Sequence, residues 1–360
     1  RSILKEEPPT DNVQNFSLLK SNSNTYDERE KENLKNKKEE GEYTLKVSNG
    51  RMINVPISLE DPKNSDYHDR HHYFVKVGCG DNYTVVLTYF GELLVWGSNL
   101  NGQHGTNSDE IQRAYKEFFT TGLAKKVDNM YTMECFPHFI TYFGIDKNRR
   151  ITNFSCGARH VLAIENGLVA YAWGDNTSGQ LGLNLQKTER VMFPQKIIEV
   201  SGMELVECQA STDFSIILTK SGDLWSCGSN RDGKLGLGMT DPWKIIYVMT
   251  KLSQPENVVK VSAGPNHVLA ICEVKVLDEN IFDELARIEE EENKPKIEKK
   301  DKQTDLYSWG NGSLGQLGLK KLESVNTPAK VEIKGDFVDI SAGFEHSAAV
   351  TSEGKMFLWG

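Results

Sequence analysis

Residues 228–234, Gly-Ser-Asn-Arg-Asp-Gly-Lys, resemble a nucleotide-binding motif more than other segments of the chain do. They match the first seven positions of a phosphate-binding loop, in which backbone amides and a lysine hold the phosphates. Leu235 stands where the motif requires a Ser or Thr for magnesium, and Gln180 or Gln316 replaces the lysine where the same glycine spacing recurs. A second glycine pattern, residues 310–315, follows a predicted strand without a helix after it to present amides to a pyrophosphate. We therefore expect no bound nucleotide.

A histidine-rich cluster and the cysteines are the candidates for metal or redox chemistry. His68, His71 and His72 lie beside Asp66 and Asp69, and these residue types ligate zinc. No distant group of ligands completes the coordination shell, so we interpret the segment as a polar connecting loop. We expect neither a metal nor another cofactor.

The six cysteines are scattered and form no Cys-x-x-Cys pair, which indicates reduced thiols. The sequence also contains no nucleophile in a recognisable elbow, so a hydrolase with a Ser-His-Asp or Cys-His site is a weak hypothesis. The predicted class is therefore non-catalytic.

The elements that position these residues repeat along the chain. Each copy has an apolar strand, a small residue followed by an anchor Gly or Ser, a His or aromatic residue, four apolar residues, a turn and a strand that ends in Trp-Gly. From the anchor to the closing glycine the distance is 17 residues in copies one, two, three and five. In copy four it is 46 residues, so this copy carries 29 extra residues. The five anchors are Gly80, Gly157, Ser211, Gly264 and Gly343.

This repeat predicts an all-β protein, a β-propeller of four-stranded blades. Glycines recur five and eight residues after each closing glycine that is followed by more chain, and the anchors of copies two, three and four are 54 and 53 residues apart. A unit of about fifty residues with short apolar runs separated by turns is typical of a propeller blade. The closing tryptophans Trp96, Trp173, Trp309 and Trp359 are expected to pack between blades, and copy three departs with Ser211 and Cys227, for which Trp225 is a candidate to compensate.

Composition agrees with a folded, soluble protein. The 360 residues are 38% hydrophobic and 26% charged, with 42 basic against 51 acidic side chains and a net charge of −9. An acidic average does not favour nucleic acid as a partner, and no apolar run approaches the roughly 20 residues of a membrane span. No signal-peptide core opens the sequence, so we expect an intracellular protein.

The motif of residues 173–182, Trp-Gly-Asp-Asn-Thr-Ser-Gly-Gln-Leu-Gly, and that of residues 342–347, Ala-Gly-Phe-Glu-His-Ser, resemble the repeat of the regulator of chromosome condensation family. The resemblance covers roughly residues 73–360 and implies a propeller. The family includes the exchange factor for the GTPase Ran, a plant ultraviolet-B receptor, and propellers attached to ubiquitin ligases and kinases. Because seven blades are usual in it, five recognisable copies imply an open or incomplete ring.

The resemblance also implies where a binding site would lie. In the Ran exchange factor, acidic and histidine residues of the loop after the anchor contribute to the exchange surface. The matching residues here are Asn82, Arg159, Asp213, Asn266 and Glu345, followed by Tyr83, His160, Phe214, His267 and His346. Only Asp213 and Glu345 of the first five are acidic, which disfavours exchange on Ran. The recurrence of His160, His267 and His346 indicates a hydrogen bond that ties blades together, since an active site needs a single copy.

The remaining segments are predicted to be tails and insertions. We expect residues 1–41 to be a disordered charged tail and 42–72 to form a degenerate blade or closing strands, whereas the propeller occupies 73–360. Insertions interrupt it at about 106–135 and 273–305, where helical apolar spacing predicts short helices that either lie on the propeller, remain solvated or dock a partner.

We therefore expect a protein-interaction platform that binds other proteins through loops and insertions. The alternative is guanine-nucleotide exchange on a Ran-like small GTPase. A third hypothesis, ultraviolet perception, needs clustered surface tryptophans beside arginines and is disfavoured, because most tryptophans occupy core positions of the repeat.

Overall fold

The computed structural model describes residues 14–16, 45–48, 51–53, 74–106, 133–143, 149–241, 243–274 and 303–360. Side chains are not described in 14–16, 45–48, 51–53 and 133–138 or at position 141. The chain divides into two compact units: residues 1–72 with 108–130, and residues 73–107 with 131–360.

In the first unit the structure describes one three-stranded antiparallel sheet. Its strands are β1 (Gln14–Phe16), β2 (Leu45–Ser48) and β3 (Arg51–Ile53), in the order β1-β2-β3. Ser48 pairs with Arg51, so β2 and β3 form a hairpin within residues 42–72, the segment that we expected to be a degenerate blade or closing strands. Strand β1 lies within residues 1–41, the segment predicted to be disordered. It pairs with β2, which is far from it along the chain. The histidine cluster at positions 66–72 lies outside the described residues.

The second unit contains five antiparallel sheets, which are the five predicted blades. Blade one consists of β4 (Phe74–Gly80), β5 (Tyr83–Thr88), β6 (Leu93–Ser98) and β7 (Met133–Phe139). Blade two consists of β8 (Ile151–Cys156), β9 (His160–Glu165), β10 (Val169–Asp175) and β11 (Arg190–Lys196). Blade three consists of β12 (Leu205–Ala210), β13 (Phe214–Thr219), β14 (Leu224–Ser229) and β15 (Ile245–Lys251). Blade four consists of β16 (Val258–Ala263), β17 (His267–Glu273), β18 (Thr304–Gly310) and β19 (Val325–Lys330). Blade five consists of β20 (Phe337–Ala342), β21 (Ser347–Thr351) and β22 (Met356–Trp359).

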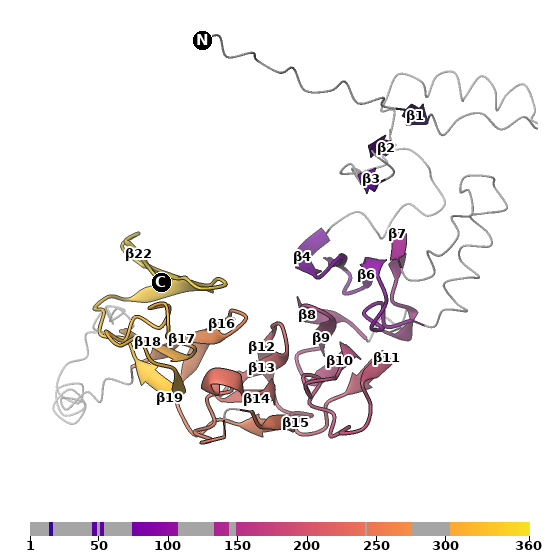
Figure 1. Cartoon of the computed structure of the whole chain (residues 1–360). Helices are drawn as coiled ribbons and strands as arrows, with labels where there is room; N and C mark the ends of the chain where they lie inside the picture. The colour runs from indigo at the N-terminus through magenta and orange to yellow at the C-terminus, as the bar shows by residue number, and fades with distance from the viewer. Residues whose placement is uncertain are drawn as a thin grey trace, which may run out of the picture. The chain divides into compact units, whose positions relative to one another are not determined.

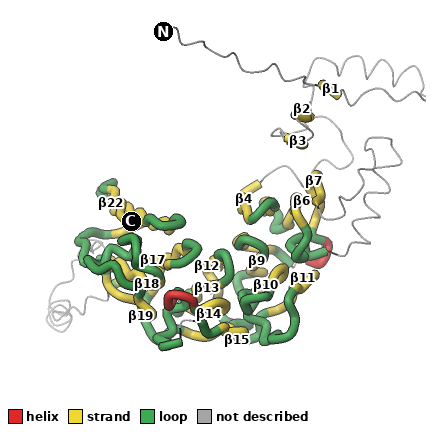
Figure 2. Tube along the Cα trace, viewed as in Figure 1, coloured by secondary structure: helices red, strands yellow, loops and turns green. Residues whose placement is uncertain are grey.

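Successive blades lie side by side in the order of the sequence. The first strand of each blade contacts the first strand of the next, from β4 through β8, β12 and β16 to β20, and Figure 1 shows these blades following one another along an arc. In Figure 2 the described helices are short red segments, the 3-10 turns η2 (Thr141–Phe143) and η3 (Arg231–Gly233). The expected all-β propeller with five recognisable blades is confirmed.

The hairpins form where the sequence provides tight-turn residues. Asn166 and Gly167 join β9 to β10, with φ angles of 52° and 70° that suit a two-residue turn between antiparallel strands. Leu168 N donates to Glu165 O at 3.0 Å, and Glu165 pairs with Val169. Gly222 and Gly354 also have positive φ in the corresponding turns of blades three and five. The predicted turn chemistry is therefore confirmed.

The closing tryptophans fill the contacts between blades. Trp173 and Trp309 are fully buried, and Trp173 Nε1 donates to Gln103 O of the preceding blade at 2.8 Å. Gly105 is required opposite this ring, because it has a φ of 62° and an added Cβ would stand 2.9 Å from Trp173 Nε1. In blade three, Cys227 replaces the tryptophan, remains fully buried and points its thiol at Gln180 O at 3.4 Å.

The two insertions leave the blades on opposite faces. Residues 107–132 connect β6 to β7 and residues 275–302 connect β17 to β18, and both segments lie outside the described residues, as do the helices predicted in them. In an up-and-down blade, the connection after the third strand shares an edge with the connection after the first strand. The connection after the second strand therefore lies at the other edge.

Candidate functional site

The site residues predicted from the repeat lie in the loops that join the first and second strands of each blade. These loops are residues 81–82, 157–159, 211–213, 264–266 and 343–346. Each of the first four receives a backbone hydrogen bond from the end of the third strand of its own blade. The bonds run from Ser98 N to Asn82 O, Asp175 N to Arg159 O, Ser229 N to Asp213 O and Asn311 N to Asn266 O, at 2.7 to 3.0 Å. We call the face that carries these loops the loop face.

Neighbouring loops are also joined to one another around the axis. Asp81 N donates to Ala158 O at 2.7 Å, and Ala158 N donates to Ser211 O at 3.0 Å. Ser211, which replaces the anchor glycine in blade three, donates its hydroxyl to Gly264 O at 2.7 Å. The departure that we noted in copy three thus adds a bond between blades.

Two of the three repeat histidines are buried between blades. His160 and His267 have no exposed surface, and their Nε2 atoms lie 2.9 and 2.8 Å from Ser215 Oγ and Ser347 Oγ of the next blade. Each serine hydroxyl donates to a backbone carbonyl, so its oxygen accepts from the histidine Nε2–H. Within the described residues, the buried Nδ1 atoms have no partner. The predicted hydrogen bond between blades is therefore present.

Burial decides the charge of these histidines. Loss of hydration lowers the pKa of His160 to about 4, although the nearby Asp175 carboxylate raises it, and burial likewise lowers the pKa of His267 to about 4. Both rings are therefore neutral near pH 7. A side chain that is enclosed and neutral has no surface to offer a partner, so His160 and His267 position the loops rather than contact a ligand.

The anchor glycine exists because the ring three residues later lies against it. A Cβ added to Gly157 would stand 2.4 Å from His160 Cε1 and 2.3 Å from Ser211 O. Tyr83 occupies the same place in blade one, where its hydroxyl donates to Gly157 O at 2.9 Å and to His160 O at 2.7 Å. Phe214 fills the place in blade three and is fully buried.

The charged residues of the loop face are largely engaged inside the protein. Arg159 pairs through Nε with Asp175 Oδ2 at 3.2 Å, and the Asp175 side chain is only 2% exposed. Asp213 accepts a hydrogen bond of 2.5 Å from Lys234 Nζ, which also donates to Pro265 O at 3.4 Å. The Lys234 side chain is 1% exposed, and its ammonium lies 5.2 Å from the centre of the Phe214 ring.

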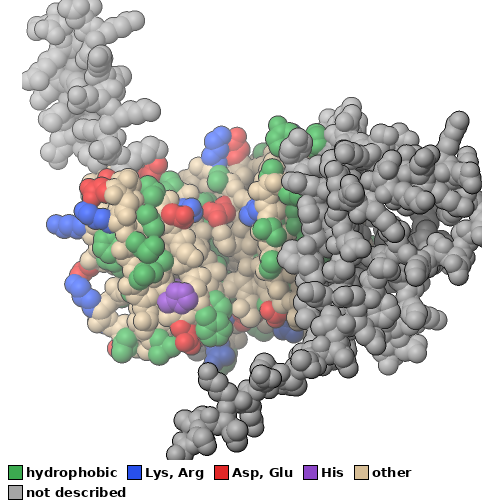
Figure 3. Space-filling view, turned by 90° about the horizontal axis from the view of Figure 1, so that it is seen from above, with side chains coloured by type: hydrophobic (Ala, Val, Ile, Leu, Met, Phe, Trp, Pro, Cys, Tyr) green, Lys and Arg blue, Asp and Glu red, His purple; other side chains and the backbone are tan. Residues whose placement is uncertain are grey.

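Glu345 and His346 are exposed, as are Asn82 and Arg159, whereas Asp213 and Asn266 are half-buried. His346 occupies the position at which His160 and His267 are buried. Apolar side chains are also exposed in this blade, with Phe344 63%, Met356 63% and Leu358 69% exposed. Figure 3 shows apolar and charged side chains interspersed on the described part of the face that it draws.

Lys234 is the functional candidate that the sequence analysis overlooked. We examined it as part of a phosphate-binding loop, but its ammonium is buried and already bound to Asp213. The segment contains the 3-10 turn η3, and the next described element is β15, so no described helix follows to present its amides to a phosphate. A signal was available: Lys234 replaces a repeat glutamine in the copy that has an aspartate directly before the repeat His or aromatic position, where the other copies have Asn82, Arg159, Asn266 or Glu345.

Neither a metal-binding cluster nor a disulfide is present among the residues whose side chains are described. No set of three or more His, Cys, Asp or Glu side chains in them is placed to hold a metal ion. The five cysteines whose side chains are described are free thiols, and burial raises the pKa of Cys208 to about 12. In the part of the chain that the structure describes, no helix has the length and apolar character that a membrane crossing requires.

Known proteins with similar sequences share the repeat. The profile of the regulator of chromosome condensation (RCC1) repeat matches residues 169–218, 221–271 and 305–350, and a second profile of the same repeat matches residues 74–103. The Ultraviolet-B receptor UVR8 of Arabidopsis thaliana is 28% identical over 295 residues, which cover 80% of this chain and 53% of that protein. The serine/threonine-protein kinase Nek9 of Xenopus laevis is 25% identical over 300 residues, which cover 79% of this chain and 26% of that protein. The chain thus spans about half the length of these curated relatives, or less.

Solved structures agree on the fold. Human WBSCR16 superposes with a TM-score of 0.61 at 21% identity, over 86% of this chain and 66% of that one. Yeast RCC1 (Prp20), solved in complex with Kap60, superposes with a TM-score of 0.50 at 18% identity, over 80% of this chain and 70% of that one. The matched residues reach all five blades, and blade three differs from the others by Ser211 in place of the anchor glycine and Cys227 in place of the closing tryptophan. The chain therefore belongs to the RCC1 repeat family of β-propellers, a fold that supports a protein-interaction or regulatory role.

Proposed function

We propose that this protein is a non-catalytic interaction platform, whose blades hold loops and insertions against partner proteins. The observation that carries the proposal is the base of the second insertion. Strands β17 and β18 pair without interruption as far as Glu273 and Thr304, and Val274 N donates to Gln303 O at 2.9 Å just beyond them. Residues 275–302 thus leave and rejoin a hairpin that is complete without them. A segment that the blade does not need for its own pairing is suited to binding.

The insertion can be tested separately from the propeller. Residues 275–302 would be replaced by Asn-Gly, the turn that joins β9 to β10 in blade two. We expect the thermal midpoint to change little, because the hairpin below the insertion is retained, whereas proteins captured from native extract by the intact chain are lost. A variant Glu345→Ala serves as the control, because it changes an exposed acid in another blade. Retention of all captured partners by the shortened chain would contradict a binding role for this insertion.

A second candidate function, exchange on a Ran-like small GTPase, is favoured by one observation. Glu345 and His346 form an exposed acid and histidine pair on the loop face. The equivalent positions argue against exchange, because Asn82, Arg159 and Asn266 are not acidic and Asp213 is bound to Lys234. The similar yeast protein Prp20p was studied for its binding properties to Gsp1p and histones, at 18% identity to this chain. That likeness supports the fold and leaves exchange as the less favoured proposal.

Release of a fluorescent guanine nucleotide from Ran, measured with catalytic amounts of this protein, distinguishes the two functions. We expect no acceleration. Glu345→Ala is a better probe than Asp213→Ala, because removal of Asp213 would leave the buried Lys234 ammonium without its carboxylate and destabilise the fold. Acceleration by the intact chain that Glu345→Ala abolishes would establish exchange in place of the platform.

A further inference from the structure

The loop that follows the closing Trp-Gly motif has the same internal hydrogen bond in three blades. In each, a glutamine Oε1 accepts from the backbone N–H two residues earlier. These bonds run from Asn101 N to Gln103 at 2.8 Å, from Ser178 N to Gln180 at 2.8 Å and from Leu314 N to Gln316 at 2.9 Å. The bond closes the loop on itself in blades one, two and four.

Blade three lacks this glutamine, and its loop has a different backbone. Lys234 stands in its place and turns to Asp213, 2.5 Å away, so the amide of Asp232 loses the acceptor that its counterparts have. Asp232 has a φ of 58°, while Asn101, Ser178 and Leu314 do not have positive φ. A left-handed conformation is uncommon for residues other than glycine, although Asp and Asn tolerate it. The Lys234 substitution is thus accompanied by a local change of shape at Asp232.

This change brings Asp232 against blade four. Asp232 Oδ2 accepts from Asn311 Nδ2 at 3.0 Å, and Asn326 Nδ2 donates to Met239 O at 3.0 Å across the same boundary. Between the two blades is a hollow of about 360 Å³. Its lining includes Asp232, Met239 and Thr240 from blade three and Ser324, Val325 and Asn326 from blade four.

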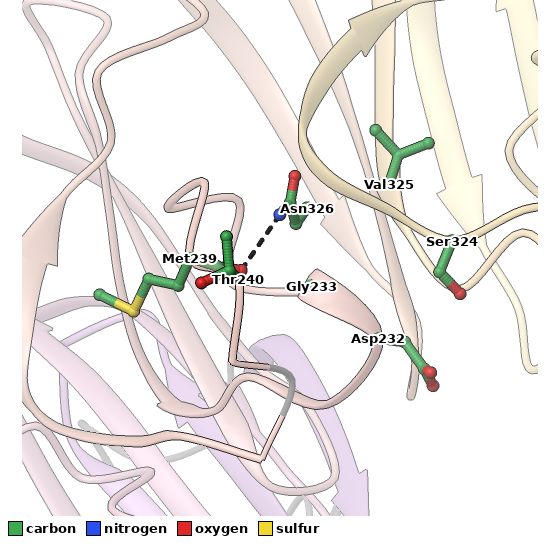
Figure 4. A pocket seen from close by; sticks show the side chains of 7 residues that line it. All are labelled: Asp232, Gly233, Met239, Thr240, Ser324, Val325 and Asn326. Atoms are coloured by element: carbon green, nitrogen blue, oxygen red, sulfur yellow. Dashed lines mark hydrogen bonds between the residues drawn. The ribbon is translucent and has the colours of Figure 1, made fainter.

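Figure 4 shows how the lining side chains are arranged. The Asp232 carboxylate lies on the same side of the hollow as the Ser324 hydroxyl, and Thr240 and Asn326 lie on the other side. The Met239 side chain points away from the others in this view, so Val325 supplies the main apolar wall. The Asp232 side chain is 29% exposed, and its Oδ2 also lies 3.9 Å from Arg231 Nε. Within the described residues its second oxygen, Oδ1, has no hydrogen bond. The hollow therefore combines an accessible carboxylate with one apolar side.

An exposed tryptophan lies three residues after Thr240, one of the residues that line the hollow. Trp243 is 74% exposed, and its backbone N donates to Asp241 Oδ1 at 2.9 Å. The guanidinium of Arg231, the residue before Asp232, lies 5.7 Å from the centre of the Trp243 ring. Exposed tryptophan and arginine are enriched among the residues that contribute most to protein interfaces. A partner that reaches the hollow can thus also contact a large apolar ring.

We propose that the hollow between blades three and four binds a lysine or arginine side chain of a partner's peptide segment, with a neighbouring apolar residue of that segment on Trp243. The charged head pairs with the Asp232 carboxylate, while the aliphatic stem lies along Val325. This inference rests on the proposed interaction function and identifies the chemistry of one partner contact. It assigns recognition to the one blade whose loop departs from the repeat.

The probe is a random heptapeptide library displayed on phage and selected on the intact chain. We expect selected peptides to share a Lys or Arg beside an apolar residue. A labelled consensus peptide should bind Asp232→Asn roughly tenfold more weakly, because a charge-assisted bond becomes a neutral one. Asparagine tolerates the left-handed conformation and can still accept from Asn311, so the thermal midpoint should be unchanged. Trp243→Ala, at an exposed site, should weaken binding several-fold.

Matched controls separate this site from the rest of the platform. Glu345→Gln removes a carboxylate from the same face in another blade, and the chain without residues 275–302 lacks the insertion. Both should bind the peptide as the intact chain does. Selection of no peptide, selection without Lys or Arg, or equal binding by Asp232→Asn would each overturn the proposal. Any of these results would leave untouched the proposal that the insertion captures partners. If only the capture by the insertion failed, binding of the peptide in the hollow would still stand.

Discussion

A closing tryptophan links two blades through both its ring and its indole N–H. Trp173 donates to the carbonyl of Gln103, Trp309 to that of Lys234 at 3.0 Å, and Trp359 to that of Gln316 at 2.8 Å. The glycine two residues after each acceptor leaves space for the ring, as Gly105 does for Trp173. The glycine therefore recurs at this spacing because the tryptophan ring of the next blade needs the space that a side chain would fill.

We predict that Trp173→Ala lowers the free energy of unfolding by about 3 to 5 kcal/mol, because it removes a fully buried ring and leaves a cavity. Trp243→Ala is the matched control, since that ring is 74% exposed, and its effect should stay within about 0.5 kcal/mol. Urea denaturation followed by circular dichroism measures both. Equal midpoints would contradict the assignment of Trp173 to the contact between blades one and two.

At the scale of the element, neighbouring blades are joined by contacts between their first strands, and two pairs of blades are also joined by a polar chain. His160, Ser215 and the carbonyl of Gln180 form one such chain, and His267, Ser347 and the carbonyl of Gln316 form another. Blade three replaces the histidine by Phe214, which is buried without a polar atom. The blade geometry thus accepts either a neutral imidazole or a phenyl ring at this place.

The neutral histidines predict a pH-dependent stability. Their folded pKa values of about 4 lie below the value of 6.5 for free histidine, so between pH 6.5 and 4 the unfolded chain binds protons that the folded chain does not. The free energy of unfolding should fall as pH decreases across this window, by up to about 3 kcal/mol per histidine, and these residues add no slope above pH 7.

Replacement of both rings isolates their contribution. In His160→Phe with His267→Phe, the acid slope between pH 6.5 and 4 should be smaller than in the parent chain, and carboxylates provide the remainder. Phe214 is the precedent for the substitution. Thermal midpoints measured at intervals of half a pH unit would show parallel curves for parent and variant if the histidines were protonated in the folded state.

At the scale of the whole molecule, the same repeat position can be core or surface. Leu306 in blade four is fully buried against blade five, whereas Met356, its equivalent in blade five, is 63% exposed. His267 and His346 differ in the same way. Exposure at these positions is decided by whether another blade lies against the sheet.

We predict that Leu306→Glu destabilises the 360-residue chain severely, by more than about 3 kcal/mol, because a carboxylate would be enclosed without a partner. Met356→Glu should change the free energy of unfolding by less than about 0.5 kcal/mol, because the new carboxylate remains hydrated. Chemical denaturation of the two variants provides the comparison. A large loss of stability in Met356→Glu would show that something covers this face of blade five in solution.

The sequence by itself determined the architecture, because the spacing of anchor, turn and closing tryptophan is local and recurs. The strands of all five blades, the turn at Asn166 and Gly167 and the tie between blades through the repeat histidines follow from that periodicity. The tertiary structure decided which of these positions a partner can reach. Burial of His160 against exposure of His346 depends on a neighbouring sheet, and periodicity contains no information about that neighbour. Lys234 pairs with Asp213, and the hollow forms beside Asp232, because loops from different strands and blades lie close together in space. The spacing of residues along the chain does not predict these distances.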